Sequence, residues 1–172
     1  MKQDSLSKFI ESIKQVWGPL NSDLIGKSQA LLEELANASS SEPWLQELSP
    51  LHESRELYRD PSGFILLAHT EKKGLYRNPH DHGNGWVIYN VQNGEMEMAT
   101  YGLTKDAGRL IRREAYRVKQ GESRVYLPGD IHDTKCISDS VLMLRLTSCD
   151  LEIEKEKGRM KKYPDTAVCP IS

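Results

Sequence analysis

The sequence of 172 residues has little of what defines several common protein classes. Its three cysteines, Cys136, Cys149 and Cys169, are too few and too widely spaced for a disulfide framework or a CxxC zinc knuckle, so a reducing, cytoplasmic setting is expected. No apolar run approaches the roughly 20 residues that a membrane span needs, and no membrane association is expected. Lysine and arginine number 23 against 25 aspartate and glutamate, without a basic stripe, so nucleic acid is not an expected partner.

Two amphipathic helices are predicted at the start of the chain. Apolar residues recur at helical spacing between Leu6 and Trp17, and again between Leu24 and Leu35. The Gly18-Pro19 pair ends the first helix, and a short helical turn is expected over residues 44–48. Residues 1–50 are therefore expected to form a helical extension within a single compact domain.

The remaining residues, 51–172, have the texture of a β-rich unit. Short apolar runs alternate with turn signals, and they predict strands near 64–70, 85–91, 95–102, 111–118, 124–127, 134–137 and 141–147. Asn93-Gly94 predicts a type I′ hairpin turn between two of these strands. The charged stretch 152–165 is expected to be a surface strand or a loose end. Helices followed by closely spaced strands favour an antiparallel barrel or sandwich with the helices packed outside.

Three of the five histidines form a pattern typical of a metal site. His80 and His82 are two residues apart, so on a strand their side chains point the same way. His132, in the run Pro-Gly-Asp-Ile-His, offers a third imidazole from a neighbouring strand. Neutral imidazole suits iron, zinc, copper or nickel, and the sequence therefore predicts a metal site at these three histidines.

The two stretches that carry these histidines, 74–102 and 121–133, resemble the two signature motifs of the cupins. The resemblance implies a mainly β fold, the cupin double-stranded β-helix or jelly roll, over roughly residues 56–148. The glutamate that commonly follows His-x-His would fall near residues 86–88, where no carboxylate stands. A three-His face is therefore expected, and whether Glu95 or Glu97 joins it stays open.

Within the cupins, the Pro-His-Asp-His-Gly run and the helical extension resemble the thiol dioxygenases, the cysteine dioxygenase-like group. The resemblance implies Fe(II) at the three histidines, with O₂ and a small thiol or acidic molecule as substrates. Zinc, nickel or manganese at the same residues, in a lyase or isomerase, is the alternative, as is a cupin that only binds a small ligand. Similar cupins are often dimers, so the resemblance allows a homodimer.

Three residues are candidates for catalytic roles. Arg59 lies at about the place where the thiol dioxygenases use an arginine to bind the substrate carboxylate, with Arg77 a weaker candidate. Arg145 lies in an apolar strand and needs an anionic partner, either a structural carboxylate or an acidic substrate. Tyr89 is a barrel-wall aromatic that can orient the substrate. The chain departs from the family after the third histidine, because the family's Ser-His-Tyr set has no counterpart in the strand around Arg145.

The sequence does not decide which side chains after His82 face the same side as the histidines. A regular strand through Gly83 and Gly85 would put Trp86 and Ile88 on the face of His80 and His82, whereas a bulge at the glycines would reverse the faces. His69, at the end of an apolar strand, is expected to be structural or exposed.

Overall fold

A computed structural model describes residues 3–48, 54–106 and 108–170 of the chain. The expected boundary between residues 50 and 51 lies outside the described residues. The helices and strands are α1 (Ser5–Val16), α2 (Ser22–Ala36), α3 (Pro43–Gln46), β1 (Ser54–Arg59), β2 (Ile65–Lys72), β3 (Tyr76–His80), β4 (Val87–Asn93), β5 (Glu95–Leu103), β6 (Leu110–Lys119), β7 (Ser123–Tyr126), β8 (Ile131–Cys136), β9 (Ser140–Thr147), α4 (Leu151–Glu156) and the 3₁₀ turn η1 (Asp165–Ala167).

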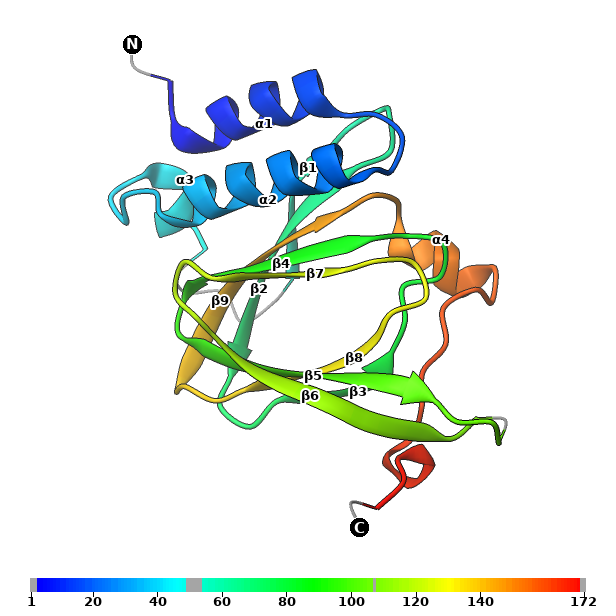
Figure 1. Cartoon of the computed structure of the whole chain (residues 1–172). Coiled ribbons are helices and arrows are strands. Elements are labelled where there is room, and N and C mark those ends of the chain that lie inside the picture. The colour runs from blue at the N-terminus through cyan, green and yellow to red at the C-terminus, as the bar shows by residue number, and fades with distance from the viewer. Residues whose placement is uncertain (1–2, 49–53, 107, 171–172) are drawn as a thin grey trace.

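The strands form two facing antiparallel sheets (Figure 1). One sheet has the order β1-β2-β9-β4-β7, and the other has the order β3-β8-β5-β6. The chain crosses from one sheet to the other at every connection between consecutive strands except those between β1 and β2 and between β5 and β6. This repeated crossing is the double-stranded β-helix, or jelly roll, that the sequence predicts.

The helices α1 and α2 lie on the outer face of the five-stranded sheet (Figure 1). Each helix begins at a side-chain cap, because Asp4 accepts from the Ser7 amide at 2.7 Å and Asn21 accepts from the Leu24 amide at 2.8 Å. The Trp17 ring, which follows α1, packs 4.7 Å from the ring centroid of Phe64. The apolar stripes predicted in both helices therefore bury the outer face of this sheet, and its inner face is left to line the barrel.

The Asn93-Gly94 turn is not the predicted hairpin. It joins β4 and β5, which belong to different sheets. No described non-glycine residue has a positive φ angle, so the turn is not type I′, although Gly94 has φ +92°. A Cβ atom on Gly94 would approach the Ser140 carbonyl oxygen to 2.4 Å. Close backbone packing at the crossing between sheets therefore requires this glycine.

The charged stretch after residue 150 also differs from its prediction. It begins as a helix, α4, whose N-cap Asp150 accepts from the Glu152 amide at 3.0 Å. Leu151 and Glu154 are buried against the barrel end, which gives this polar segment a fixed position. None of the described helices is long and apolar enough to cross a membrane.

Candidate metal centre

Two of the three candidate metal ligands are cross-strand neighbours. His80 ends β3 and lies directly opposite His132 on β8, with their ring centroids 4.7 Å apart. His82 follows β3, and its ring centroid is 5.2 Å from that of His80 and 5.0 Å from that of His132. One ring nitrogen of each histidine lies within 4.8 Å of the other two. The structure thus brings the three predicted ligands into a near-regular triangle.

The loop after β3 directs His82 back into the barrel. Gly83 has φ +60°, a left-handed conformation that favours glycine. A Cβ atom on Gly83 would approach Oε2 of Glu154 to 2.5 Å. The same Glu154 carboxylate accepts from the Asn84 amide at 3.0 Å. The ligand loop is therefore clamped by a side chain of α4.

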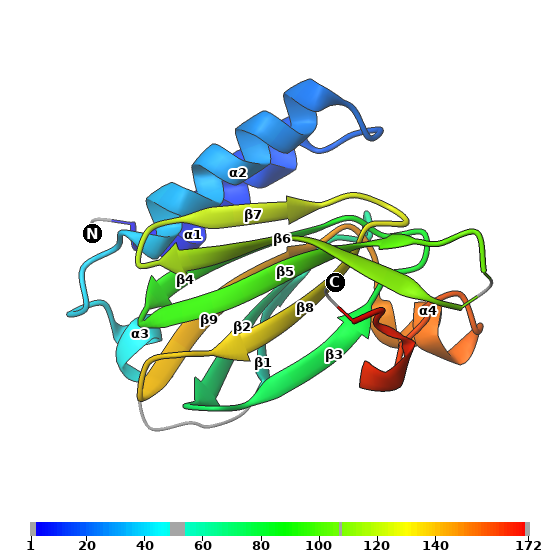
Figure 2. The ribbon, with the colours of Figure 1, turned by 60° about the horizontal axis from the view of Figure 1, so that its bottom comes forward.

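A segment that follows α4 lies along the same loop (Figure 2). The Asp81 amide donates to the Lys161 carbonyl at 3.0 Å, and the Lys161 amide donates to the Asp81 carboxylate at 3.0 Å. Lys162 forms an isolated β-bridge with His80 itself. The backbone that carries two of the ligands is thus held by residues about 80 positions later in the chain.

The three imidazoles are neutral in the folded protein. Burial lowers the pKa of His82 to about 3 and lowers the pKa of His132 well below its usual value, with nearby His80 adding to both effects. Burial also lowers the pKa of His80. Its Nδ1 lies 2.8 Å from the Asn78 carbonyl oxygen, a contact that requires an N–H at Nδ1 and leaves Nε2 as the electron-pair donor.

The residues present fit a metal ion. The Nε2 atoms of His82 and His132 are 3.3 Å apart. Two nitrogens bound to one tetrahedral metal at about 2.0–2.1 Å would be separated by about 3.3 Å. Neutral imidazoles are also the form that binds iron, zinc or nickel. The group is therefore a three-His metal site by both its spacing and its protonation state.

Neither Glu95 nor Glu97 belongs to the group, which contains no carboxylate among the described residues. Glu95 pairs with Arg117 at 3.5 Å, and Glu97 pairs with Arg112 at 3.4 Å. Between and after them, the side chains of Met96 and Met98 are buried in the barrel interior. Strand alternation therefore turns both glutamates toward the outer face of their sheet.

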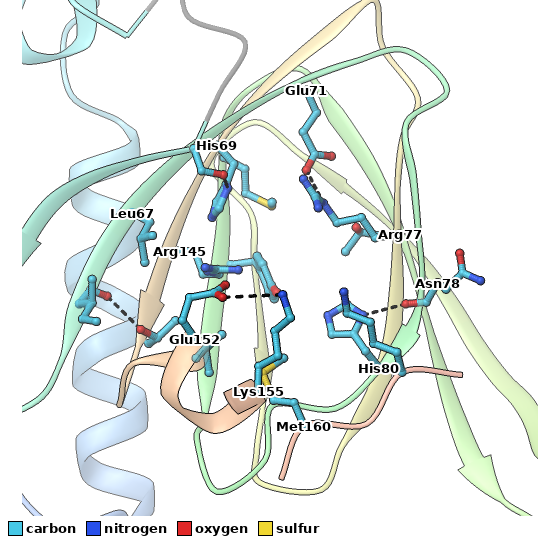
Figure 3. A pocket seen from close by; sticks show the side chains of 18 of the residues that line it. Leu67, His69, Glu71, Arg77, Asn78, His80, Arg145, Glu152, Lys155 and Met160 are labelled. Carbon is cyan, nitrogen blue, oxygen red and sulfur yellow. Dashed lines mark hydrogen bonds and ion pairs between the residues drawn. The ribbon is translucent and has the colours of Figure 1, made fainter. Parts of the chain in front are cut away.

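A cavity of about 760 Å³ occupies the barrel next to the histidines. His80 and Tyr89 line it, and Arg145 lies near its centre (Figure 3). The α4 residues Glu152 and Lys155 face each other at 3.7 Å across one side of it. Of the three histidines only His80 lines the cavity, so a small molecule can approach the metal site from the side of His80, where α4 covers part of the opening.

Arg145 is the unusual charge in this cavity. It forms no ion pair with any described residue, and its Nε atom is buried with no hydrogen-bond partner among them. Its strand neighbours across the sheet are Leu67 and Tyr89, both uncharged. The sequence leaves either a structural carboxylate or an acidic substrate as the partner of Arg145. No carboxylate of the described residues forms an ion pair with it.

Tyr89 points into the barrel beside the metal site. Its hydroxyl oxygen is 3.3 Å from Nε2 of His82, and a hydrogen bond with Arg145 also acts on it. Burial raises the pKa of Tyr89, so the hydroxyl stays protonated. Trp86 and Ile88 pack on the outer face instead, under the helices. The physical reason is that the loop between β3 and β4 carries the chain from the four-stranded sheet to the five-stranded sheet, so no regular strand runs through Gly83 and Gly85.

Arg59 lies at the cavity mouth, with its side chain 49% exposed. Its guanidinium donates to Glu56 at 2.8 Å and to Asp150 at 2.7 Å. Arg77 is similarly paired with Glu71 at 2.9 Å. Both charges are already balanced by carboxylates, which is the physical reason to assign substrate binding to another arginine.

His69 is a cavity residue that the sequence does not identify. It lies on β2, is 6% exposed and lines the cavity, with the Ser54 hydroxyl against its Nδ1. Burial lowers its pKa to about 3, with the charge of Arg145 adding to the effect. The only sequence signal is that His69 is two residues from both Leu67 and Glu71, so the three share one face of β2. This signal becomes informative once that face is known to line the cavity.

Neither protein-family models nor curated proteins give a match to this chain. Solved structures with a similar fold include KdgF from Halomonas sp., at 18% identity over 56% of this chain and 77% of that chain, with a TM-score of 0.48. Others are the Schizosaccharomyces pombe Cnp3 cupin domain (13% identity, 62% and 66% coverage, TM-score 0.47) and a recombinant oxalate oxidase in complex with glycolate (18%, 65% and 55%, TM-score 0.45). Function is therefore inferred from the residues of this chain alone.

Proposed function

We propose that this chain is a metal-dependent enzyme of the cupin type that acts on a small organic acid. The observation that carries the proposal is the Arg145 guanidinium, whose buried Nε atom has no hydrogen-bond partner among the described residues and which lies in the cavity beside three buried histidines. A buried guanidinium N–H without a partner favours an anionic acceptor, and a carboxylate matches the fork of a guanidinium. A bound acid would supply the counter-charge that the described residues do not.

In its finer form, we propose an Fe(II) dioxygenase that uses O₂ and favours small thiol acids. His80, His82 and His132 would hold the metal, and their neutral charge leaves a net positive ion that attracts anionic ligands. When bound there, iron(II) would supply the electrons that allow O₂ to react with the substrate. Both oxygen atoms would end in the product, as the sequence resemblance implies.

The side chains around the metal site would bind and orient the substrate. Arg145 would bind the carboxylate, and the Tyr89 hydroxyl, protonated and between Arg145 and His82, would donate to an oxygen of the bound acid. The apolar side chains of Leu67 and Met143 line the same cavity and would exclude water from the acid's carbon chain. Arg145 and these uncharged side chains would together orient the reacting end of the substrate toward His80.

The test combines metal analysis with oxygen consumption. Protein purified without added metal would be analysed for iron, zinc, nickel and manganese, and oxygen uptake would be followed over a panel of small thiols and catechol-like acids. We expect about one iron per chain and thiol-dependent uptake that Arg145→Met lowers and Arg59→Met, its surface-paired control, does not.

The other outcomes separate the alternatives. Zinc or nickel with no oxygen uptake would contradict the dioxygenase and favour Lewis-acid chemistry at the same histidines. Acid binding that needs Arg145, without turnover under any metal, would favour a ligand-binding module. Binding of acids unaffected by Arg145→Met would contradict the proposal as a whole.

A further inference from the structure

The inner face of β2 continues the cavity beyond Arg145. Leu67, His69 and Glu71 alternate along this strand, so they share one face, with successive side chains about 7 Å apart. His69 and Glu71 are 6% and 3% exposed, and both line the cavity. Figure 3 shows them with Arg77 around the same opening as Arg145. This side of the cavity is polar, although nothing in the metal site requires it to be.

Three buried atoms on this side have no hydrogen-bond partner among the described residues. They are Nε2 of His69, Oε2 of Glu71 and Oγ1 of Thr134, and all three residues line the cavity. The other polar atom of each ring or carboxylate is held in place, because Ser54 contacts Nδ1 of His69 and Arg77 binds Oε1 of Glu71. Buried polar atoms are normally paired, so three unpaired ones in one cavity wall, two of them on side chains held in place, form a binding surface for polar groups.

His69, Glu71 and Thr134 form what we call the polar subsite. The charges in and around it disfavour the binding of ions. Arg77 balances Glu71 at 2.9 Å, so the pair is neutral overall. The charge of Arg77 and that of Arg145 both act on His69, and they would repel a cationic group. Glu71 would repel a second anion. A neutral group that both donates and accepts hydrogen bonds satisfies a carboxylate oxygen, a hydroxyl and an imidazole together, and a hydroxyl is the simplest such group.

We infer that the substrate is a hydroxylated carboxylic acid, whose hydroxyl groups bind His69, Glu71 and Thr134 while its carboxylate binds Arg145. The inference rests on the proposed function for the role of Arg145, and it adds hydroxyl groups on the carbon chain of the acid, whether or not that acid also carries a thiol. A cavity of about 760 Å³ has room for a chain of several carbons beyond the carboxylate. The polar subsite then distinguishes the substrate from apolar acids of the same length.

The experiment compares gluconate with hexanoate, which has the same six carbons and no hydroxyls. Dissociation constants for both acids would be measured by titration calorimetry on the protein as purified. We expect gluconate to bind about tenfold more tightly, and Thr134→Val and His69→Leu each to reduce this preference about three- to tenfold, the worth of one hydrogen bond. Thr147→Val is the matched control, because its hydroxyl lines the cavity but already contacts the Ile65 carbonyl oxygen.

Each other result overturns a defined part. Equal binding of the two acids, with both lost in Arg145→Met, would overturn the polar subsite and leave the proposed function standing. A gluconate preference that persists in Thr134→Val and His69→Leu would also overturn it, because metal chelation would then explain the preference. Binding of neither acid would overturn the inference together with the acid-binding role of Arg145.

Discussion

Arg145 on β9 lies directly opposite Tyr89 on β4, and the two side chains form a polar pair on the inner face of the five-stranded sheet. The neighbour of Arg145 on its other side is Leu67. Neither strand neighbour carries a charge, and the buried Nε atom of Arg145 has no hydrogen-bond partner among the described residues. A bound anion would therefore stabilise the folded protein by pairing with this guanidinium.

Replacing Arg145 with methionine separates binding from stability. We expect Arg145→Met to weaken the binding of small organic acids about 10- to 100-fold, since a hydrogen bond to a charged group is worth about 1.5–3 kcal/mol. We also expect the Tm to stay the same or rise, because no ion pair within the described residues is lost. Calorimetry and thermal unfolding measure the two effects. A large fall in Tm would show that a structural partner had been overlooked, and Arg59→Met is the control for loss of a surface charge.

Replacing a histidine of the metal site should remove the metal, whereas replacing a buried histidine outside that site should not. We expect His82→Ala to lower the bound metal to under about a tenth per chain, because two imidazoles alone bind a divalent ion weakly. His69→Ala should keep the wild-type content, because His69 lies outside the three-His group. Plasma emission analysis of both purified variants decides this. Equal metal content in the two would contradict the assignment of the ligands.

The loop glycine between the ligands and α4 should be sensitive to a single methyl group. We expect Gly83→Ala to lower the free energy of unfolding by about 1–2 kcal/mol and to lower the metal content, because of the left-handed φ and the contact with Glu154. Gly74→Ala isolates the backbone contribution, because Gly74 has φ +85° and a methyl group added there would meet no atom within 4 Å. Chemical denaturation of both would reveal the difference. If the two variants lost stability equally and both kept their metal, the clamp by Glu154 would be unimportant.

The buried histidines make the stability of the metal-free protein depend on pH. The pKa values of His69 and His82 are about 3 in the folded state, whereas a histidine in an unfolded chain has a pKa near 6.5. Between these values the unfolded state binds more protons, so the free energy of unfolding falls as the pH is lowered from about 6.5 toward 3. Each such histidine contributes about 1.4 kcal/mol per pH unit. Urea titrations between pH 6.5 and 5 should show a smaller slope for His69→Leu, by about one proton, and an unchanged slope would contradict the neutral state of His69.

The sequence predicts the histidine triangle because its two motifs contain all three ligands, although His82 lies in the loop after β3 and not on the strand with His80. His80 and His132 meet as cross-strand partners, and their motifs identify them without knowledge of any other contact. The helices are equally predictable, since the apolar stripe that ends at Trp17 has one face to bury. These features depend on local periodicity, which a sequence displays directly.

The sequence does not predict features that depend on which sheet a strand joins. Asn93-Gly94 is a turn in both the prediction and the structure, but the partners of its two strands are set by distant segments. His69 has the local pattern of a structural residue, and only the pairing of β2 with β9 brings it near Arg145. Tyr89 faces inward because β4 belongs to the sheet that faces β3, a placement that the local sequence does not display.

The β-bridge between His80 and Lys162 has a consequence for the order of biosynthesis. The ribosome makes the histidines of β3 long before it makes Lys161 and Lys162, which hold their backbone in place. A nascent chain that has reached only β9 carries all three imidazoles but not the brace that fixes two of them. We therefore expect stable capture of the metal to follow the emergence of the segment around Lys161 and Lys162 from the ribosome and its pairing with the ligand loop.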